Sequence, residues 1–371
     1  MERDQDNAFT VLAIDGGGMR GLYTASVLRA LAGRFAVQRN IDHLDIGKGF
    51  DLIVGTSTGG ILASGLAAGL PVGGIQALYR TFGPRIFTDP VPKSRGRLCL
   101  WLLRHRDRSG NSSGPLRTAL LSAFGDETIG ELYGRRAIGL CLPATSLLDH
   151  SPRVFKTPHL ERRDRDDNLS VVDACLATSA APLYLPIASV NPNQLADEFY
   201  VDGGLWANSS ILVGLLEGLA LAHPEQPLTI ISIGTCPPVA GTAPVSRLDA
   251  GVLQWLNRML ILNLGMNAQA VAARNMSNLL AHQLDRLGKE VRIVRCHESS
   301  PSADQSGLLQ LDSATADSIS LMETMGTSDA QAMFRWCQPP NTKEGQLLQA
   351  VFDRMPALET SNTLGERNEG L

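Results

Sequence analysis

Short apolar runs alternate along this chain with longer segments of helical periodicity. "FTVLAI" (9–14) and "FDLIVG" (50–55) are apolar throughout, as expected of strands that are buried on both faces. Each run is followed by a segment, 22–35 and 58–70, whose apolar residues recur at helical spacing. This order of elements predicts an α/β fold with a mostly parallel sheet that is covered by helices on both faces.

The same pattern continues through most of the sequence and predicts further elements. Strands are expected over 137–147, 153–157, 198–204, 228–235 and 290–296, and helices over 71–82, 170–181, 209–222, 251–286, 315–336 and 342–354. We expect one domain over residues 1–335, followed by a C-terminal helix and a polar tail over 336–371. The last dozen residues are polar and are expected to be frayed.

The segment 88–114 departs from this pattern. It places six basic residues around the apolar stretch "LCLWLL" (98–103); they are Lys93, Arg95, Arg97, Arg104, Arg106 and Arg108. Such a segment is compatible with a lid over a site, with a membrane-contacting element or with a regulatory surface. The alternative is a short buried helix with solvated basic flanks. The sequence does not distinguish these interpretations.

Composition narrows the class of protein. The 371 residues are 44% hydrophobic and 19% charged, which allows a large core, and the net charge of −4 gives no reason to expect nucleic-acid binding. No apolar run approaches the ~20 residues of a membrane span, and the polar N-terminus has no signal-peptide layout. The six cysteines form no C-x-x-C pair, so we expect neither a metal site nor a disulfide framework. These features predict a cytoplasmic protein.

The pattern G-x-S-x-G occurs twice, around Ser57 and around Ser112. A nucleophile elbow needs a strand before the serine and a helix after it, and flanking glycines allow their close approach. Ser57, between Gly55 and Gly59, has this context. Ser112 lies in the polar stretch "RSGNSSGP" and is interpreted as a loop residue. The structural alternative for Ser57 is a tight turn that caps a helix.

A nucleophilic serine needs a base. Of the seven histidines, His223, His282 and His297 follow a plausible acid in the chain, and His297 is the best candidate among them for a triad. None of the three lies in a glycine-marked turn. Asp202 instead follows the strand-like "EFYV" and precedes Gly203, so a carboxylate at a strand end is the other candidate base. Its structural alternative is a turn aspartate.

The stretch "IDGGGMRG" (14–21) allows two interpretations. It fits the dinucleotide-binding pattern G-x-G-x-x-G, with acids at Asp42 and Asp45, although these acids precede the second strand and the fingerprint expects an acid at its end. Alternatively, glycine N–H groups at a helix N-terminus line an oxyanion hole. The turns after the first two strands would then meet at the carboxyl edge of the sheet.

Four stretches in this order resemble the patatin-like phospholipase family: "DGGGMRG" (15–21), "GTSTGG" (55–60), "ATSAAP" (177–182) and "DGG" (202–204). The resemblance implies a three-layer fold and hydrolysis of fatty acyl esters of phospholipids by a Ser57–Asp202 dyad without histidine. It also implies an oxyanion hole at Gly16, Gly17 and Gly18, with Arg20 supporting the loop. The run after Asp202 reads "DGGLWANSS", which departs from the family's usual Asn-Asn-Pro.

The short form of the chain further resembles bacterial patatin-like effectors of anti-phage systems, which a cyclic dinucleotide activates. This implies membrane phospholipid as the substrate, a cyclic dinucleotide as an activator and no required cofactor or metal. It also implies peripheral contact with the inner membrane when the enzyme is active. The alternatives are a constitutive patatin-like esterase or lysophospholipase and a nucleotide-binding module.

Overall fold

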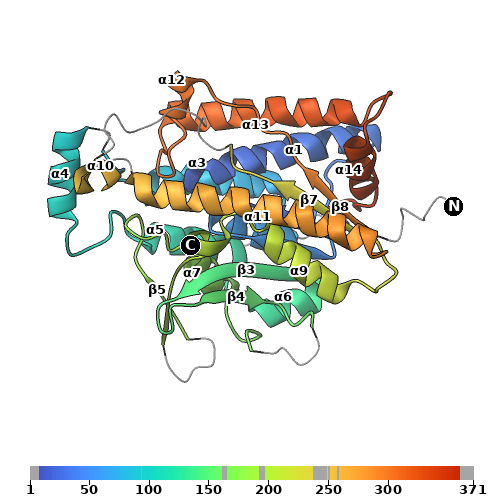
Figure 1. Cartoon of the computed structure of the whole chain (residues 1–371), viewed down its shortest axis with the longest axis horizontal. Coiled ribbons are helices and arrows are strands. Elements are labelled where there is room, and N and C mark those ends of the chain that lie inside the picture. Colours follow the sequence, from blue (N-terminus) through green and yellow to red (C-terminus); the bar gives the residue numbers. More distant parts are fainter. Residues whose placement is uncertain are drawn as a thin grey trace.

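The computed structural model of the protein describes residues 8–92, 94–160, 165–191, 197–236, 249, 251–256 and 259–359, without the side chains of Arg95 and Leu253. One sheet of eight strands lies between layers of helices (Figure 1). The predicted α/β class, with a mostly parallel central sheet flanked by helices, is confirmed. The predicted polar N-terminus, Lys93 and the predicted polar tail beyond residue 359 lie outside the described residues.

The structure confirms the predicted strands and most of the predicted helices and adds several others. The single helix predicted over 251–286 is instead two helices, α10 and α11, and residues 257–258 between them lie outside the described residues. The strands are β1 Phe9–Ile14, β2 Leu52–Gly55, β3 Gly139–Ser146, β4 Pro152–Lys156, β5 Ala188–Val190, β6 Glu198–Asp202, β7 Leu228–Ile233 and β8 Val291–Arg295. The helices are α1 Gly21–Gln38, α2 Thr58–Ala68, α3 Val72–Ile86, α4 Arg95–Arg104, α5 Gly114–Phe124, α6 Ile129–Arg136, α7 Val171–Thr178, α8 Gly204–Ala207, α9 Ile211–Leu221, α10 Val252–Leu256, α11 Leu260–Arg286, α12 Ala303–Ser306, α13 Ala316–Trp336 and α14 Lys343–Asp353, with short 3-10 turns at Gly18–Arg20 and Gly47–Gly49.

Strand β1 lies inside the sheet and is buried on both faces. Its side chains alternate between two cores, since Leu12 and Ile14 pack with the helices of one layer while Val11 and Ala13 pack with the other. Neighbours β2 and β7 pair with β1 in parallel, and β3 and β8 extend the sheet in parallel on either side. This double burial explains why the sequence of β1 is continuously apolar.

The C-terminal helices pack on the first helix of the chain. Helix α13 lies along α1 (Figure 1), and α14 contributes Phe352, whose ring stacks on Phe35 of α1 with the centroids 4.7 Å apart. Leu348 and Val351 of α14 are buried in the same core. The residues described on either side of the predicted boundary at 335 therefore share one core.

Three strands on one side of the sheet run antiparallel to their neighbours. Strand β3 pairs with β4 along one of its edges; the other edge is divided between two strands. Its first part pairs with β2 (Val54↔Cys141), and its last part pairs antiparallel with β6 (Ala144↔Asp202). The end of β6 therefore lies just beyond the carboxyl end of β2. This register brings Asp202 to the turn that contains Ser57.

The helices α5 and α6 lie in a stretch for which the sequence analysis assigns no element. Helix α6 has only eight residues and begins with a capping box, in which Thr128 and Glu131 each accept the other's backbone N–H. Its polar exposed side and short length leave little apolar periodicity to detect. Local capping and packing against the core, rather than a long apolar repeat, stabilise such a helix.

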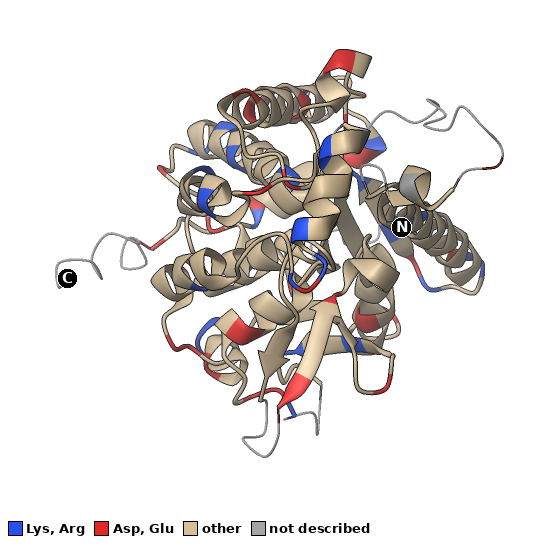
Figure 2. Ribbon diagram, turned by 90° about the vertical axis from the view of Figure 1, so that its left-hand side faces the viewer, with Lys and Arg blue, Asp and Glu red and all other residues tan. Residues whose placement is uncertain are grey.

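Charged residues of both signs are interspersed over the ribbon in Figure 2. Among the described residues, no helix combines the length and the apolar character that crossing a membrane requires.

Candidate active site

Ser57 lies in a sharp turn between β2 and α2. Its backbone has φ 57° and ψ −130°, a conformation that non-glycine residues rarely adopt and that costs about 1–3 kcal/mol. A Cβ atom on Gly55 would lie 2.3 Å from the carbonyl oxygen of Gly59, and one on Gly59 would lie 2.4 Å from that of Asp15. Both glycines therefore permit the close approach of strand, helix and neighbouring loop that a nucleophile elbow requires.

The end of β6 places a carboxylate against this serine. Ser57 Oγ donates to Asp202 Oδ2 at 2.6 Å, and the Gly204 N–H donates to Oδ1 at 2.6 Å. Burial raises the pKa of Asp202 to about 6, although both hydrogen bonds act in the opposite direction. The carboxyl is thus ionised at neutral pH yet more basic than an ordinary aspartate. Gly203 is required because a Cβ there would lie 2.2 Å from the Pro143 carbonyl oxygen.

The glycine loop lies beside this pair, at the carboxyl end of β1. The Gly16 N–H donates to the carbonyl oxygen of Asn208 at 2.8 Å and is therefore occupied. Within the described residues, no hydrogen bond engages the N–H of Gly17 or Gly18. Of the three glycines predicted to form an oxyanion hole, these two keep a donor for a ligand.

The loop is held in shape by close backbone contacts. Gly18 has φ +58°, and a Cβ there would lie 2.3 Å from the Leu311 carbonyl oxygen, which also accepts the Met19 N–H. Arg20 is buried, and its Nε donates to the Gly17 carbonyl oxygen at 3.3 Å. This contact turns the carbonyl of Gly17 toward the arginine.

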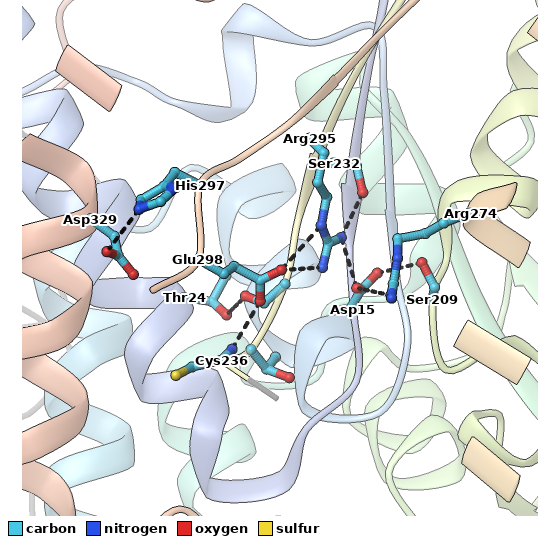
Figure 3. Close-up of polar contacts among 12 residues, drawn as sticks. Asp15, Thr24, Ser209, Ser232, Cys236, Arg274, Arg295, His297, Glu298 and Asp329 are labelled. Atoms are coloured by element: carbon cyan, nitrogen blue, oxygen red, sulfur yellow. Dashed lines mark hydrogen bonds and ion pairs between the residues drawn. The ribbon is translucent and has the colours of Figure 1, made fainter. Parts of the chain in front are cut away.

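An ion-pair network anchors the residue before the loop (Figure 3). The Asp15 carboxylate accepts a hydrogen bond from Ser209 Oγ at 2.8 Å and pairs with Arg295 at 2.8 Å and with Arg274 at 4.0 Å. Arg295 also pairs with Glu298 at 2.6 Å. Burial raises the pKa of Asp15, and the positive charge of Arg295 opposes that effect. The network joins the start of the glycine loop to the end of β8.

Two threonines for which the sequence analysis gives no role contact the site. Thr178, in the "ATSAAP" stretch, accepts the Ser57 N–H on its Oγ1 at 3.0 Å, and its own carbonyl accepts the Gly203 N–H at 3.3 Å. It therefore fixes the turns of both members of the pair. Thr58 Oγ1 is buried without a hydrogen-bond partner in the described part of the chain. The only indication of Thr178 in the sequence analysis was that "ATSAAP" resembles a family motif.

Ser57 and Asp202 border a cavity whose walls are almost entirely apolar. Its other lining residues include Phe87, Ala181, Leu185, Leu262, Met266 and Leu311. A second apolar cavity shares Gly18, Thr58, Phe87, Ser179 and Leu185 with the first and continues past Ile61, Tyr79, Phe82, Leu116 and Leu120. Such walls suit an extended hydrocarbon chain whose carbonyl carbon lies at Ser57.

The basic segment 88–114 packs against residues that line this cavity. Within it, α4 buries Leu98 and Trp101, and Trp101 packs with Tyr184, Leu262 and Leu311. The His105 ring contacts the Asp89 carboxylate at 2.8 Å, which closes the segment on itself. A short helix is observed here, but it is only half buried, since Leu100 and Leu103 are exposed. Its buried side packs against residues that line the cavity. Arg95 has no described side chain.

The other serine and the histidines considered from sequence are not brought to this site. Ser112 is exposed before α5, and its Oγ accepts only the nearby Gly114 N–H in the described structure. The His297 ring lies 3.7 Å from Asp329, on the α13 side (Figure 3). Among the described residues, no histidine hydrogen-bonds to Ser57.

A group of possible metal ligands, Cys141, His159 and Glu217, lies among the residues described. Lys156 Nζ contacts Glu217 at 2.5 Å, so the carboxylate already has a cationic partner. Burial raises the pKa of the Cys141 thiol well above its ordinary value, which disfavours the thiolate that a metal requires. The cluster is accounted for as a buried polar network.

The sequence similarity to known proteins agrees with this geometry. Residues 12–214 match the patatin-like phospholipase family. The chain is 37% identical over 250 residues (67% of this chain, 68% of the relative) to a cGAMP-activated phospholipase of Pseudomonas aeruginosa. It is 31% identical over 347 residues (88% and 92%) to a cGAMP-activated phospholipase of Vibrio cholerae. It is 27% identical over 241 residues (63% and 66%) to a cUMP-AMP-activated phospholipase of Escherichia coli.

The chain therefore belongs to the patatin-like phospholipase family, and the predicted enzyme class, carboxylic ester hydrolase, is confirmed. Neither acid that the dinucleotide-binding interpretation requires lies at the end of the second strand, where the fingerprint expects one. Asp45 is buried and pairs with Arg136 at 2.7 Å, and Asp42 is exposed.

Proposed function

We propose that this phospholipase is a lipid acyl hydrolase of the phospholipase A type that works with a Ser57–Asp202 dyad and no histidine. The observation that carries the proposal is the 2.6 Å hydrogen bond between these side chains at the wall of an apolar cavity. The hydrogen bond gives the serine proton an acceptor, and the cavity gives an acyl chain a place to bind.

In the first step, Asp202 takes the proton of the Ser57 hydroxyl as the oxygen attacks the acyl carbonyl carbon. The carbonyl oxygen becomes negative and accepts hydrogen bonds from the N–H groups of Gly17 and Gly18. The ester bond then breaks. The leaving alkoxide takes the proton from Asp202 and departs as the lysolipid alcohol, and the acyl group remains on Ser57.

In the second step, water attacks the acyl-enzyme and gives its proton to Asp202. Collapse of the second oxyanion releases the fatty acid and returns the proton to Ser57. The same carboxyl therefore acts as base and acid in both halves of the reaction, which suits a pKa of about 6. The chemistry requires no cofactor.

The dyad is tested with Ser57→Ala and Asp202→Ala, with Ser112→Ala as the matched control in the other G-x-S-x-G sequence. Release of fatty acid from phosphatidylglycerol and phosphatidylethanolamine vesicles is the measurement. We expect both dyad variants to lose at least ~10⁴-fold in rate, and the control to be unchanged. A Ser57→Ala enzyme with wild-type activity would contradict the mechanism.

The proposed enzyme is gated by a cyclic dinucleotide and degrades membrane phospholipid during anti-phage defence. The support is that relatives over most of this chain are named cGAMP-activated phospholipases, and another is named a cUMP-AMP-activated phospholipase. Vesicle hydrolysis with and without cGAMP and cUMP-AMP tests the gating. A constitutive esterase, the alternative, would hydrolyse lipid equally in all three conditions.

The proposed location is the cytoplasm, with peripheral contact at the inner membrane in the active state. Helices α4 and α10 lie at one end of the molecule (Figure 1). Leu100 and Leu103 of α4 are 68% and 67% exposed, and Val252 and Trp255 of α10 are also exposed. Because exposed apolar residues beside arginines suit an anionic lipid surface, this end is the proposed contact.

A further inference from the structure

The helices α1, α3 and α13 enclose an open groove that lies outside the acyl cavity. Its lining residues are Ser26, Arg29, Ala30, Gly33, Arg34, Val37, Gln38, Gln76, Thr327 and Phe334. None of these is acidic. The groove thus combines two cations, two side-chain amides, two hydroxyls and an aromatic ring on three neighbouring helices (Figure 1).

The two arginines of the groove keep their charge available. Arg29 Nη1 donates to Gln76 Oε1 at 2.7 Å, and the Arg34 guanidinium lies 5.4 Å from the centre of the Phe334 ring. Neither arginine has a carboxylate within ion-pair distance among the described residues. Between them on α1, a Cβ atom on Gly33 would meet no atom within 4 Å, so the groove has free space there.

We propose that this groove binds the cyclic dinucleotide that activates the enzyme, an inference that rests on the gated function proposed above. A cyclic dinucleotide carries two phosphodiesters and two flat bases. Arginine pairs strongly with phosphate oxygens through its planar set of donors, and bases stack on aromatic rings and guanidinium planes. Gln38 supplies an amide donor and acceptor for a base edge. The buried Gln76 amide already bonds Arg29, Ser26 and Glu323, so its part is to hold Arg29 in place.

The walls of the groove continue into the catalytic turns. Helix α1 begins at Gly21, directly after the glycine loop. One turn after Gln76 on α3, the Tyr79 hydroxyl donates to the carbonyl oxygen of Thr58, the residue that follows Ser57, at 2.7 Å. A ligand that binds one arrangement of α1 and α3 more tightly than another therefore biases both the glycine loop and the serine turn.

The test uses the full-length enzyme and two independent changes to the groove. Arg29→Ala/Arg34→Ala removes the phosphate partners, and Gly33→Glu adds bulk and negative charge at a helical position with open space. Arg286→Ala, on the exposed end of α11, is the matched control. Binding of cGAMP, cUMP-AMP and AMP is measured by calorimetry, vesicle hydrolysis gives the response, and thermal unfolding verifies folding.

We expect both groove variants to fold like the wild type and to lose at least ~10-fold in cyclic-dinucleotide affinity, with the same loss in activation. The Arg286→Ala enzyme should keep wild-type affinity for the cyclic dinucleotide and wild-type activation by it. If the groove variants bind the cyclic dinucleotide and respond to it like the wild type, the ligand does not bind in this groove, and the proposed gating by a cyclic dinucleotide still holds. Equal binding of AMP overturns the dinucleotide assignment. A wild-type enzyme that responds to neither dinucleotide refutes the gating itself, and this inference with it.

Discussion

Replacement of Asp202 by Asn is expected to abolish hydrolysis and, at neutral pH, to stabilise the folded protein. The asparagine amide cannot accept the Ser57 proton, although its oxygen can still accept the Gly204 N–H that now binds the carboxylate at 2.6 Å. The packing of the site is kept because the two side chains have nearly the same shape. Loss of activity with a gain in stability would distinguish a catalytic carboxylate from a structural one.

The size of the gain follows from the pKa of Asp202. Burial raises that pKa from the ordinary 3.8 to about 6. The folded protein therefore holds this proton more tightly than the unfolded chain, and the resulting stability, complete below pH ~4, is lost as the pH rises through about 6. The loss corresponds to about 3 kcal/mol of unfolding free energy as an upper bound. An amide, which stays neutral, does not carry this cost.

The assay is denaturant unfolding of the wild type and Asp202→Asn between about pH 4 and pH 8, with Asp126→Asn as the control for an exposed aspartate. The variant should unfold at higher denaturant than the wild type at about pH 7.5, and the difference should shrink steadily toward pH 4. A difference that does not change with pH would refute the reasoning about burial. An active Asp202→Asn enzyme would refute the dyad.

Other predictions concern the rate, the loop and the membrane. Because the base must be ionised, kcat/KM should rise tenfold per pH unit up to about pH 6 and then level off, measured on a soluble ester. Gly18→Ala, at φ +58° and against the Leu311 carbonyl oxygen, should cost ~10²–10³ in kcat. Leu100→Glu/Leu103→Glu should reduce hydrolysis of vesicles but not of soluble esters; Leu148→Glu, exposed elsewhere, should reduce neither. Equal loss on both substrates would contradict the membrane contact.

Local sequence patterns predicted the parts of the site that short-range geometry determines. The apolar runs β1 and β2, and the glycines after each of them, indicated two turns at one edge of a parallel sheet. A Cβ at Gly18, Gly55 or Gly59 would collide with nearby backbone. Glycine is therefore required at these positions, and a sequence pattern that contains them indicates the turns. Ser57 could likewise be distinguished from Ser112, because only Ser57 has a strand-like run before it and a helical pattern after it.

No local sequence pattern indicated which distant segments would contact one another. That Ser57 meets Asp202 depends on β3, whose edge pairs first with β2 and then with β6. Local sequence patterns indicated each residue separately, and at the level of sequence only the family resemblance paired them. The hydrogen bond from the Gly16 N–H to Asn208 likewise appears only when α8 and the glycine loop are packed together.

The sequence by itself thus determined the fold class, the two glycine-flanked turns after β1 and β2, and the residue types available for the proposed ester hydrolysis. Only the tertiary structure decided which glycine N–H groups remain for an oxyanion, how far burial raises the pKa of Asp202, and that α4 packs against residues lining the cavity. The physical reason is that turns obey the backbone preferences of a few adjacent residues, whereas burial, electrostatics and hydrogen-bond partners depend on segments that only folding brings together.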